Sequence, residues 1–152
     1  FSQLAFDIAD NGDFYVSFEA DSLVYRYDHD YNQLACFGFA GRDMDLNYLR
    51  WDSYDQPWKE RLAERMSRGF YNAVEYVDET GLLFRSYRKG GGSVTDGLQV
   101  YRDGVLVGDV DVPLGFRMAG YVEPYYYSYV VPDEEGERLY MFRFKWPSAP
   151  EE

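Results

Sequence analysis

The chain has 152 residues, of which 46% are hydrophobic, so it can bury the core of one compact domain and is not disordered throughout. Its net charge of −12 repels phosphate backbones and anionic lipid head groups, which argues against nucleic-acid binding. No apolar stretch approaches the roughly 18 residues that a membrane helix needs, so no span is predicted.

Aromatic residues make up 20% of the chain and favour strands, because flat rings pack well on pleated sheets. Apolar and polar residues alternate over residues 4–8 and 14–18, and Asn11-Gly12 between them predicts a hairpin. Further strands are expected at 23–27 and 33–39, which makes residues 1–41 an antiparallel four-stranded unit. Cys36, the one cysteine, is expected to be a small buried residue and cannot form an internal disulfide.

Residues 42–69 are interpreted as a helical insertion. Asp55 is the expected cap, Pro57 suits the first turn and Gly69 ends the helix. Three apolar side chains recur at helical spacing on one face: Trp58, Leu62 and Met66. The helix is therefore expected to pack as a lid on the sheet edges rather than to bind a partner.

Strand patterns return in two further units, at 70–112 and 113–146, followed by a tail at 147–152. Gly90-Gly91-Gly92 lacks the Gly-Lys-Ser/Thr ending of a phosphate loop and is interpreted as a flexible hairpin connector. Tyr125, Tyr127 and Tyr129 share one face of their strand, and we expect them to fill the space between two units; stacking on sugar rings is the alternative.

An aromatic residue followed by Arg recurs on the expected third strand of each unit, at Tyr25-Arg26, Tyr101-Arg102 and Phe142-Arg143. The last two pairs are about 40 residues apart, the period of a propeller blade, and the longer first interval contains the helical insertion. The fold class predicted is all-β: a β-propeller of about three four-stranded antiparallel blades, half of a six-bladed ring, with one short helical insertion. Three blades cannot close a ring, so we expect an excerpt of a longer chain, a partner chain or a different closure.

Several stretches carry a family resemblance, namely residues 6–16, 24–28, 37–44, 81–87, 109–113 and 140–144. In these the chain resembles the C-terminal half of six-bladed, TolB-like and NHL-like propeller proteins of Bacteroides-type bacteria. The resemblance implies an exported, periplasmic or outer-membrane-anchored lipoprotein, whose lipid-attachment cysteine would lie in an N-terminal region.

The chemical motifs are weak. Asp7 with Asn11 and Gly12 matches part of a calcium loop, as does the register that starts at Asp28, but both lack the closing carboxylate and are interpreted as turns. His29 is the one histidine, so an imidazole-based zinc site or a catalytic triad within this chain would have to use it, and neither is expected. No catalytic residue, metal ligand or cofactor is predicted, although carboxylate pairs such as Asp43 with Asp45 and Asp109 with Asp111 leave glycosidase-like chemistry open.

The leading hypothesis is a binding or scaffold protein that holds a small molecule, glycan or protein at the ring axis or the top face. Its candidate ligand-binding residues lie in connections over one end of the sheets: Trp51, Tyr54, Arg85, Tyr87 and Arg88. The alternative is a propeller-type lyase or hydrolase whose active-site residues lie mostly in missing N-terminal blades. A third possibility is a self-contained three-unit domain that dimerises.

Overall fold

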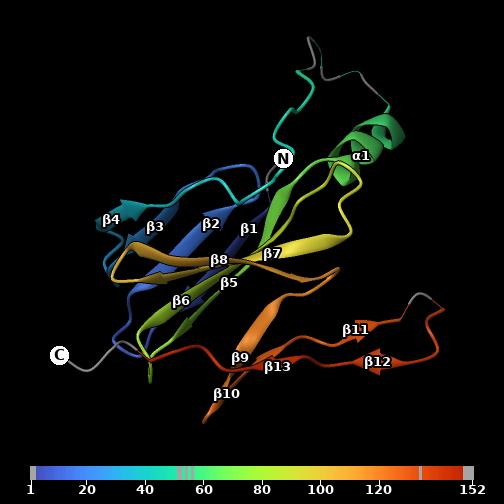
Figure 1. The fold of residues 1–152 in the computed structure, drawn as a ribbon. Coiled ribbons are helices and arrows are strands. Elements are labelled where there is room, and N and C mark those ends of the chain that lie inside the picture. The colour runs from blue at the N-terminus through green and yellow to red at the C-terminus, as the bar shows by residue number, and fades with distance from the viewer. Residues whose placement is uncertain (1–2, 51–52, 54, 56, 134, 149–152) are drawn as a thin grey trace.

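The computed structural model describes residues 3–50, 53, 55, 57–133 and 135–148. In this part of the chain the fold is mostly β, with antiparallel sheets of four, four, three and two strands and one short helix (Figure 1). No helix among the described residues is long and apolar enough to cross a membrane.

The first sheet is a meander of β1 (Leu4–Ile8), β2 (Phe14–Phe18), β3 (Val24–Tyr27) and β4 (Gln33–Phe37). The predicted β1–β2 hairpin is confirmed: Gly12 adopts a φ of 88°, and the Asp13 N–H donates to the Asn11 side chain over 2.9 Å. The fourth strand ends two residues earlier than expected. Gly38 adopts a φ of 141° there, and a Cβ on it would lie 2.3 Å from the Ser22 carbonyl oxygen.

The second sheet consists of β5 (Phe70–Val77), β6 (Leu82–Arg88), β7 (Thr95–Arg102) and β8 (Val105–Pro113), again in chain order. Asp103 and Gly104 join β7 to β8 with φ values of 50° and 77°, the positive pair that a tight hairpin turn requires. These four strands agree with the second four-stranded unit expected from the sequence.

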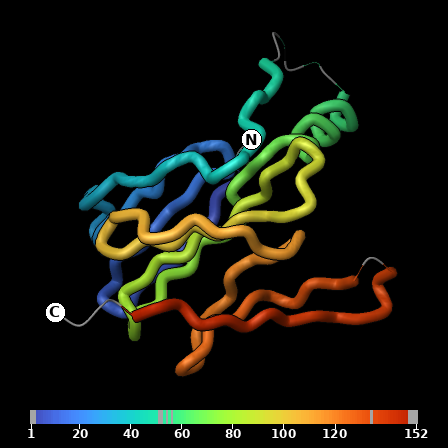
Figure 2. Tube along the Cα trace, viewed as in Figure 1, coloured from blue at the N-terminus to red at the C-terminus, as the bar shows by residue number. Residues whose placement is uncertain are grey.

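The third unit differs from the expected four-stranded blade. Its sheet has three strands in the order β13-β10-β9, built from β9 (Met118–Val122), β10 (Tyr125–Ser128) and β13 (Arg143–Phe144), while β11 (Val131–Pro132) and β12 (Leu139–Tyr140) form a separate hairpin. The register between β10 and β9 shifts at Ser128, whose hydroxyl donates to the Tyr129 carbonyl and accepts from the Phe142 N–H. Beyond Tyr129 the chain leaves the sheet as a projecting hairpin (Figure 2).

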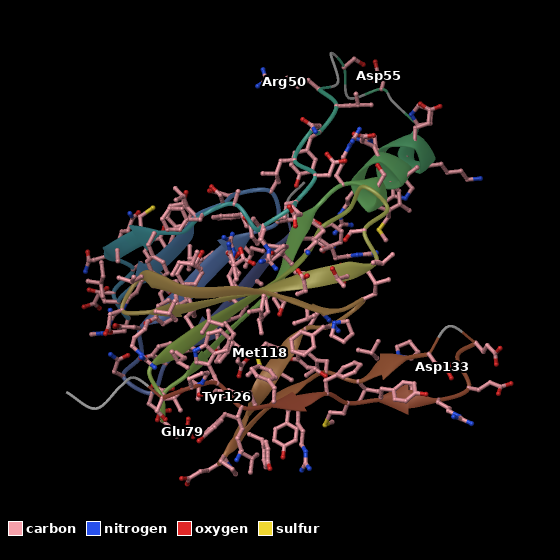
Figure 3. All side chains as sticks on the ribbon, in the orientation of Figure 1. Arg50, Asp55, Glu79, Met118, Tyr126 and Asp133 are labelled. Atoms are coloured by element: carbon pink, nitrogen blue, oxygen red, sulfur yellow. The ribbon has the colours of Figure 1, made fainter. Side chains whose placement is uncertain are left out.

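The orientation of the tyrosines on β10 is also opposite to the expected one. Tyr126, not Tyr125, Tyr127 or Tyr129, is buried, and its ring lies 4.8 Å from that of Phe84 on β6. Figure 3 shows Tyr126 and Met118 in the contact between the third and second sheets. Because side chains alternate along a strand, the Tyr125 and Tyr127 rings point to the outer face.

The second sheet is covered on both faces. One core cluster lies between the first and second sheets and includes Tyr15, Val24, Val74 and Tyr101. The other lies between the second and third sheets and includes Phe84, Val100, Met118 and Tyr126. The three sheets are therefore stacked in chain order, with β6 and β7 buried almost throughout.

The first strands of the three units, β1, β5 and β9, lie side by side. The Tyr71 N–H at the start of β5 donates to the carbonyl of Glu19, which follows β2, and the Asp10 N–H after β1 donates to Asp78 after β5. Near the ends of both strands, the Tyr76 N–H on β5 donates to the Asp7 carboxylate on β1 over 2.7 Å. These bonds hold β1 and β5 parallel, so their starts lie at the same end of the molecule.

The helix α1 (Trp58–Ser67) does not pack as a lid. Its N-cap is Pro57 without a side-chain cap bond, so Asp55 does not cap it, and none of its residues is buried. The expected apolar stripe of Trp58, Leu62 and Met66 is exposed. The helix is held instead by charge: Arg65 pairs with Glu19, and Arg68 pairs with Asp45 over 2.8 Å.

The outer face of the first sheet is exposed and apolar. Phe6 and Ile8 on β1 retain 60% and 59% exposure. Cys36 lies on this face too, opposite Tyr25, and is exposed rather than buried as expected. The sequence correctly predicts that side chains alternate along β4, but none of the described residues covers the face that carries Cys36.

Candidate functional site

The structure describes three of the five predicted binding residues. Trp51 and Tyr54 lie outside the described residues. Arg85 and Tyr87 on β6 are fully buried, whereas Arg88 at the end of the same strand is half-buried and lines a cavity. The role of these residues in ligand binding stays a prediction, and their contacts are described in turn below.

Arg85 connects the second sheet to the first. Its Nε donates to the Ser17 hydroxyl over 2.8 Å, and its two terminal nitrogens donate to backbone carbonyls at the β2–β3 connection, those of Asp21, Ser22 and Leu23. The guanidinium lies over the Tyr71 ring, 3.3 Å from its centroid. Among the described residues no carboxylate forms an ion pair with Arg85, and burial lowers its pKa. Its donors are thus engaged within the chain.

Tyr87 is enclosed by glycines. A Cβ on Gly97 would lie 1.9 Å from its ring, and one on Gly41 would lie 2.5 Å away. The hydroxyl donates to Asp109 over 2.5 Å, and burial together with this bond raises the pKa of Tyr87. Tyr87 therefore fastens the start of the β4–β5 connection onto the second sheet.

Arg88 lies beside a cavity of about 370 Å³ at the β6–β7 connection. Gly90, Gly91 and Gly92 all have positive φ there, and the Gly91 N–H donates to the Ser67 carbonyl at the end of α1 over 2.8 Å. A Cβ on Gly90 would meet the Arg68 backbone at 2.3 Å. Gly90 is required for this close approach, and the connector is packed against the helical insertion.

A second cavity, of about 280 Å³, lies where the first strands begin; we call it the strand-start cavity. It is lined by residues from all three units: Gln3, Leu4, Ala5, Glu19, Phe70, Tyr71, Asn72 and Arg117. Leu4 starts β1, Phe70 starts β5 and Arg117 directly precedes β9, so the cavity lies where the first strand of each unit begins.

Glu19 is the most buried charged group of the strand-start cavity, with 4% exposure. Arg65 of α1 donates through Nε to Glu19 Oε1 over 2.6 Å and through Nη2 to Gln3 over 2.9 Å. Glu19 Oε2 is buried and has no hydrogen-bond partner among the described residues. A buried carboxylate oxygen without a donor is unfavourable, so the Arg65 pair holds Glu19 at some cost in stability.

Asn72 provides a second unused acceptor. A β-bulge between Tyr71 and Ala73 leaves Asn72 without a partner on β6, and its buried Oδ1 accepts no hydrogen bond from the described residues. Bulges of this kind commonly redirect a side chain near a functional site. Asn72 and Glu19 thus line the same cavity, and each carries one buried oxygen that has no hydrogen-bond partner among the described residues.

Arg117, just before β9, lines the same cavity and is exposed. Its guanidinium lies over the Tyr129 ring at 5.0 Å, and among the described residues it forms no ion pair. With Arg65 paired to Glu19, the Arg117 charge is the one left uncompensated at this site.

Further along the first strands, Glu75 on β5 faces Gly120 on β9, where a Cβ would lie 3.9 Å from Glu75 Oε1. Burial, with a smaller contribution from the Asp7 carboxylate, raises the pKa of Glu75 to about 7. This carboxyl group is a candidate proton donor or acceptor near neutral pH.

The predicted turn residues behave as turns. The Asp28 carboxylate accepts from the N–H groups of Asp30 and Asn32, both over 2.9 Å, and His29 is exposed next to Asp30. In the part of the chain that the structure describes, no group of three or more His, Cys, Asp or Glu side chains could hold a metal ion.

Comparisons with known proteins support the fold. No family model matches the chain, and no curated protein matches its sequence. A solved structure does match: the crystal structure of a member of the DUF4221 family from Bacteroides vulgatus, with a TM-score of 0.55 at 9% sequence identity. The match covers 83% of this chain and 39% of that one, so the chain spans well under half the length of its structural match. At this identity the likeness concerns the fold alone.

Sequence reasoning missed the residues of the strand-start cavity, Glu19, Asn72 and Arg117. One partial signal was available: Glu19 directly follows an expected strand, and Arg117 lies at the start of another, so both are near connections between strands. The bulge at Asn72 and the pairing of Glu19 with Arg65 depend on tertiary contacts and leave no pattern in the sequence.

Proposed function

We propose that the three units are consecutive blades of a β-propeller, with β1, β5 and β9 as the strands nearest the axis. The side-by-side packing of these strands and the burial of both faces of the second sheet support this arrangement. The exposed apolar face around Phe6 and Ile8 is then the surface on which a further sheet of the ring packs. The greater length of the matched structure, of which this chain covers 39%, agrees with additional sheets.

Structure determination of the product of the full-length open reading frame tests this arrangement. The expected result is a ring, six-bladed by the resemblance noted above, in which another sheet covers Phe6 and Ile8. A closed barrel or a two-layer sandwich contradicts it. Cell fractionation of the same product tests the export that the resemblance implies.

Within this arrangement, we propose that the protein binds a small ligand at the strand-start cavity without transforming it. The observation that carries this proposal is a cavity of about 280 Å³ near the axis, lined by residues of all three units and including the exposed Arg117. A concave site with a few polar groups is typical of small-molecule binding.

A titration of the ¹⁵N-labelled chain with a small-molecule library tests the site. Binding is expected to shift the Asn72 side-chain amide and the Arg117 guanidinium signals, while signals around the exposed Arg138 on the β11–β12 hairpin stay unchanged. Shifts that gather at the Arg88 cavity instead would place the site there, and the absence of any specific shift would contradict ligand binding.

The second candidate is a lyase or hydrolase that uses Glu75, because its pKa of about 7 suits general acid–base chemistry. Activity of the full-length protein that is lost in Glu75→Gln would support this candidate. An unchanged activity in that variant would exclude Glu75 from the chemistry.

A further inference from the structure

Arg117 is the accessible charge of the strand-start cavity. It directly precedes β9, is exposed to solvent and lines the cavity. Among the described residues that line it, Glu19 is the one carboxylate, and its side chain is 4% exposed and paired with Arg65. A molecule in the cavity therefore meets an uncompensated positive charge, while the negative charge is both paired and shielded.

The stacking of Arg117 leaves its donors free. Its guanidinium lies over the Tyr129 ring, 5.0 Å from the ring centroid. This contact uses the flat face of the guanidinium, whereas its N–H groups lie in the plane and point outward. In the part of the chain that the structure describes, these N–H groups take part in no hydrogen bond or ion pair. A planar fork held in this way is suited to a bidentate bond with a carboxylate.

Charge narrows the class of ligand. An ammonium group on the occupant would be repelled by Arg117, and a neutral group would leave the charge of Arg117 uncompensated. A dianion such as phosphate would bring a second negative charge to a chain whose net charge is −12. One carboxylate matches the single free charge, and the more distant carboxylates of the chain are screened beyond about 10 Å at 0.1 M salt.

Size and lining narrow the class again. About 280 Å³ is at the low end of small-molecule sites and suits one small molecule rather than a chain. Leu4, Ala5 and Phe70 supply apolar walls, and Leu4 keeps 51% exposure, so its side chain is open to contact. A compact hydrocarbon group can cover these walls while a carboxylate attached to it reaches Arg117.

We propose that the strand-start cavity binds a small apolar monocarboxylate, with its carboxylate on Arg117 and its hydrocarbon part on Leu4 and Phe70. This inference rests on the proposed function of the cavity as a ligand site. It adds the chemical class of the ligand and the residue that selects it.

The test compares three probes of nearly equal size on the ¹⁵N-labelled chain: benzoate, the neutral benzamide and the cationic benzylamine. We expect benzoate to shift the Arg117 Nε–H signal and the Leu4 backbone amide saturably. Benzamide is expected to bind at least tenfold more weakly, and benzylamine not to bind. Benzoate binding is also expected to weaken as NaCl is raised from about 0.05 M to about 0.5 M, because the charge of Arg117 is exposed.

Matched variants separate the charge from the planar fork, with the Leu4 amide as the signal. Arg117→Gln removes the charge and is expected to weaken benzoate binding at least tenfold. Arg117→Lys keeps the charge without the fork and should fall between Arg117→Gln and the unmodified chain. Arg138→Gln, at an exposed position on the β11–β12 hairpin, should leave binding unchanged. A thermal melt identifies loss of folding; if Arg117→Gln does not fold, Arg117→Lys and the salt series decide.

The outcomes distinguish this inference from the proposed function. Equal binding of benzoate and benzamide, or benzoate binding that Arg117→Gln or added salt leaves unchanged, would overturn the carboxylate class. If benzoate fails while a library compound without a carboxylate shifts the same signals, the class falls and the cavity remains a ligand site. If neither the three probes nor the library shifts these signals, both proposals fall.

Discussion

Replacing Arg85 by Met is expected to weaken the contact between the first and second sheets more than any single apolar truncation on the surface. The change keeps most of the aliphatic stem but removes every donor. The Ser17 hydroxyl and the three backbone carbonyls of the β2–β3 connection then lose their hydrogen bonds, and the cation over the Tyr71 ring is lost. The reasoning depends on these groups being shielded from water in the folded chain.

The magnitude follows from these contacts. Four acceptors at roughly 1 kcal/mol each and a stacked cation worth about 1–2 kcal/mol oppose the desolvation cost of the buried guanidinium, which the substitution relieves. We expect a net loss of about 3 kcal/mol in the free energy of unfolding, or roughly 6–12 °C in Tm for a chain of this length.

Urea unfolding followed by circular dichroism measures the effect, with the exposed Arg138→Met as the matched control, expected to change stability by less than about 0.5 kcal/mol. Arg85→Lys keeps the charge but not the planar fork and should fall between the two. A loss below about 1 kcal/mol for Arg85→Met would refute the claim that this arginine joins the sheets.

Three further changes test separate parts of the structure. Because the pKa of Glu75 is raised to about 7 in the folded state, the free energy of unfolding falls as pH rises from about 4.5 through 7. Glu75→Gln should therefore be more stable than the unmodified chain by about 1 kcal/mol at pH 8 and equally stable at pH 4. A stability difference that does not change with pH would contradict this. Gly97→Ala should lower the free energy of unfolding by about 2–3 kcal/mol because its Cβ would meet the Tyr87 ring, and by much less in a Tyr87→Ala background. Gly120→Ala, whose Cβ has no close neighbour, should lower it by less than about 1 kcal/mol. If urea unfolding shows that the losses from the Gly97 and Tyr87 changes are additive, the clash is not present. Cys36 should react with a thiol reagent in the native chain at nearly its unfolded rate, and strong protection would mean that the outer face of the first sheet is covered.

Local patterns predicted the strands well where turn chemistry and alternation agreed. Asn11-Gly12 and Asp103-Gly104 lie in the tight turns expected of them, because few residues other than Asn, Asp and Gly tolerate positive φ. The aromatic-Arg signature also fell on the third strand of each sheet, or immediately before it at Phe142.

The errors arose where tertiary contacts override local pattern. The stripe of Trp58, Leu62 and Met66 predicted a buried face, yet the helix is held by Arg65 and Arg68 through ion pairs to distant carboxylates. Tyr126 rather than its neighbours faces the core, since period-two alternation cannot tell which face of a uniformly aromatic strand is covered.

The most direct test of the stacked arrangement is a set of aromatic NOEs from the second sheet to the sheets on either side. Tyr76 should show NOEs to Tyr15 on the first sheet, and Phe84 to Tyr126 on the third, because each pair of ring centroids lies 4.8 Å apart on opposite faces of the second sheet. Direct NOEs between Tyr15 and Tyr126, with those to the second sheet missing, would contradict the account.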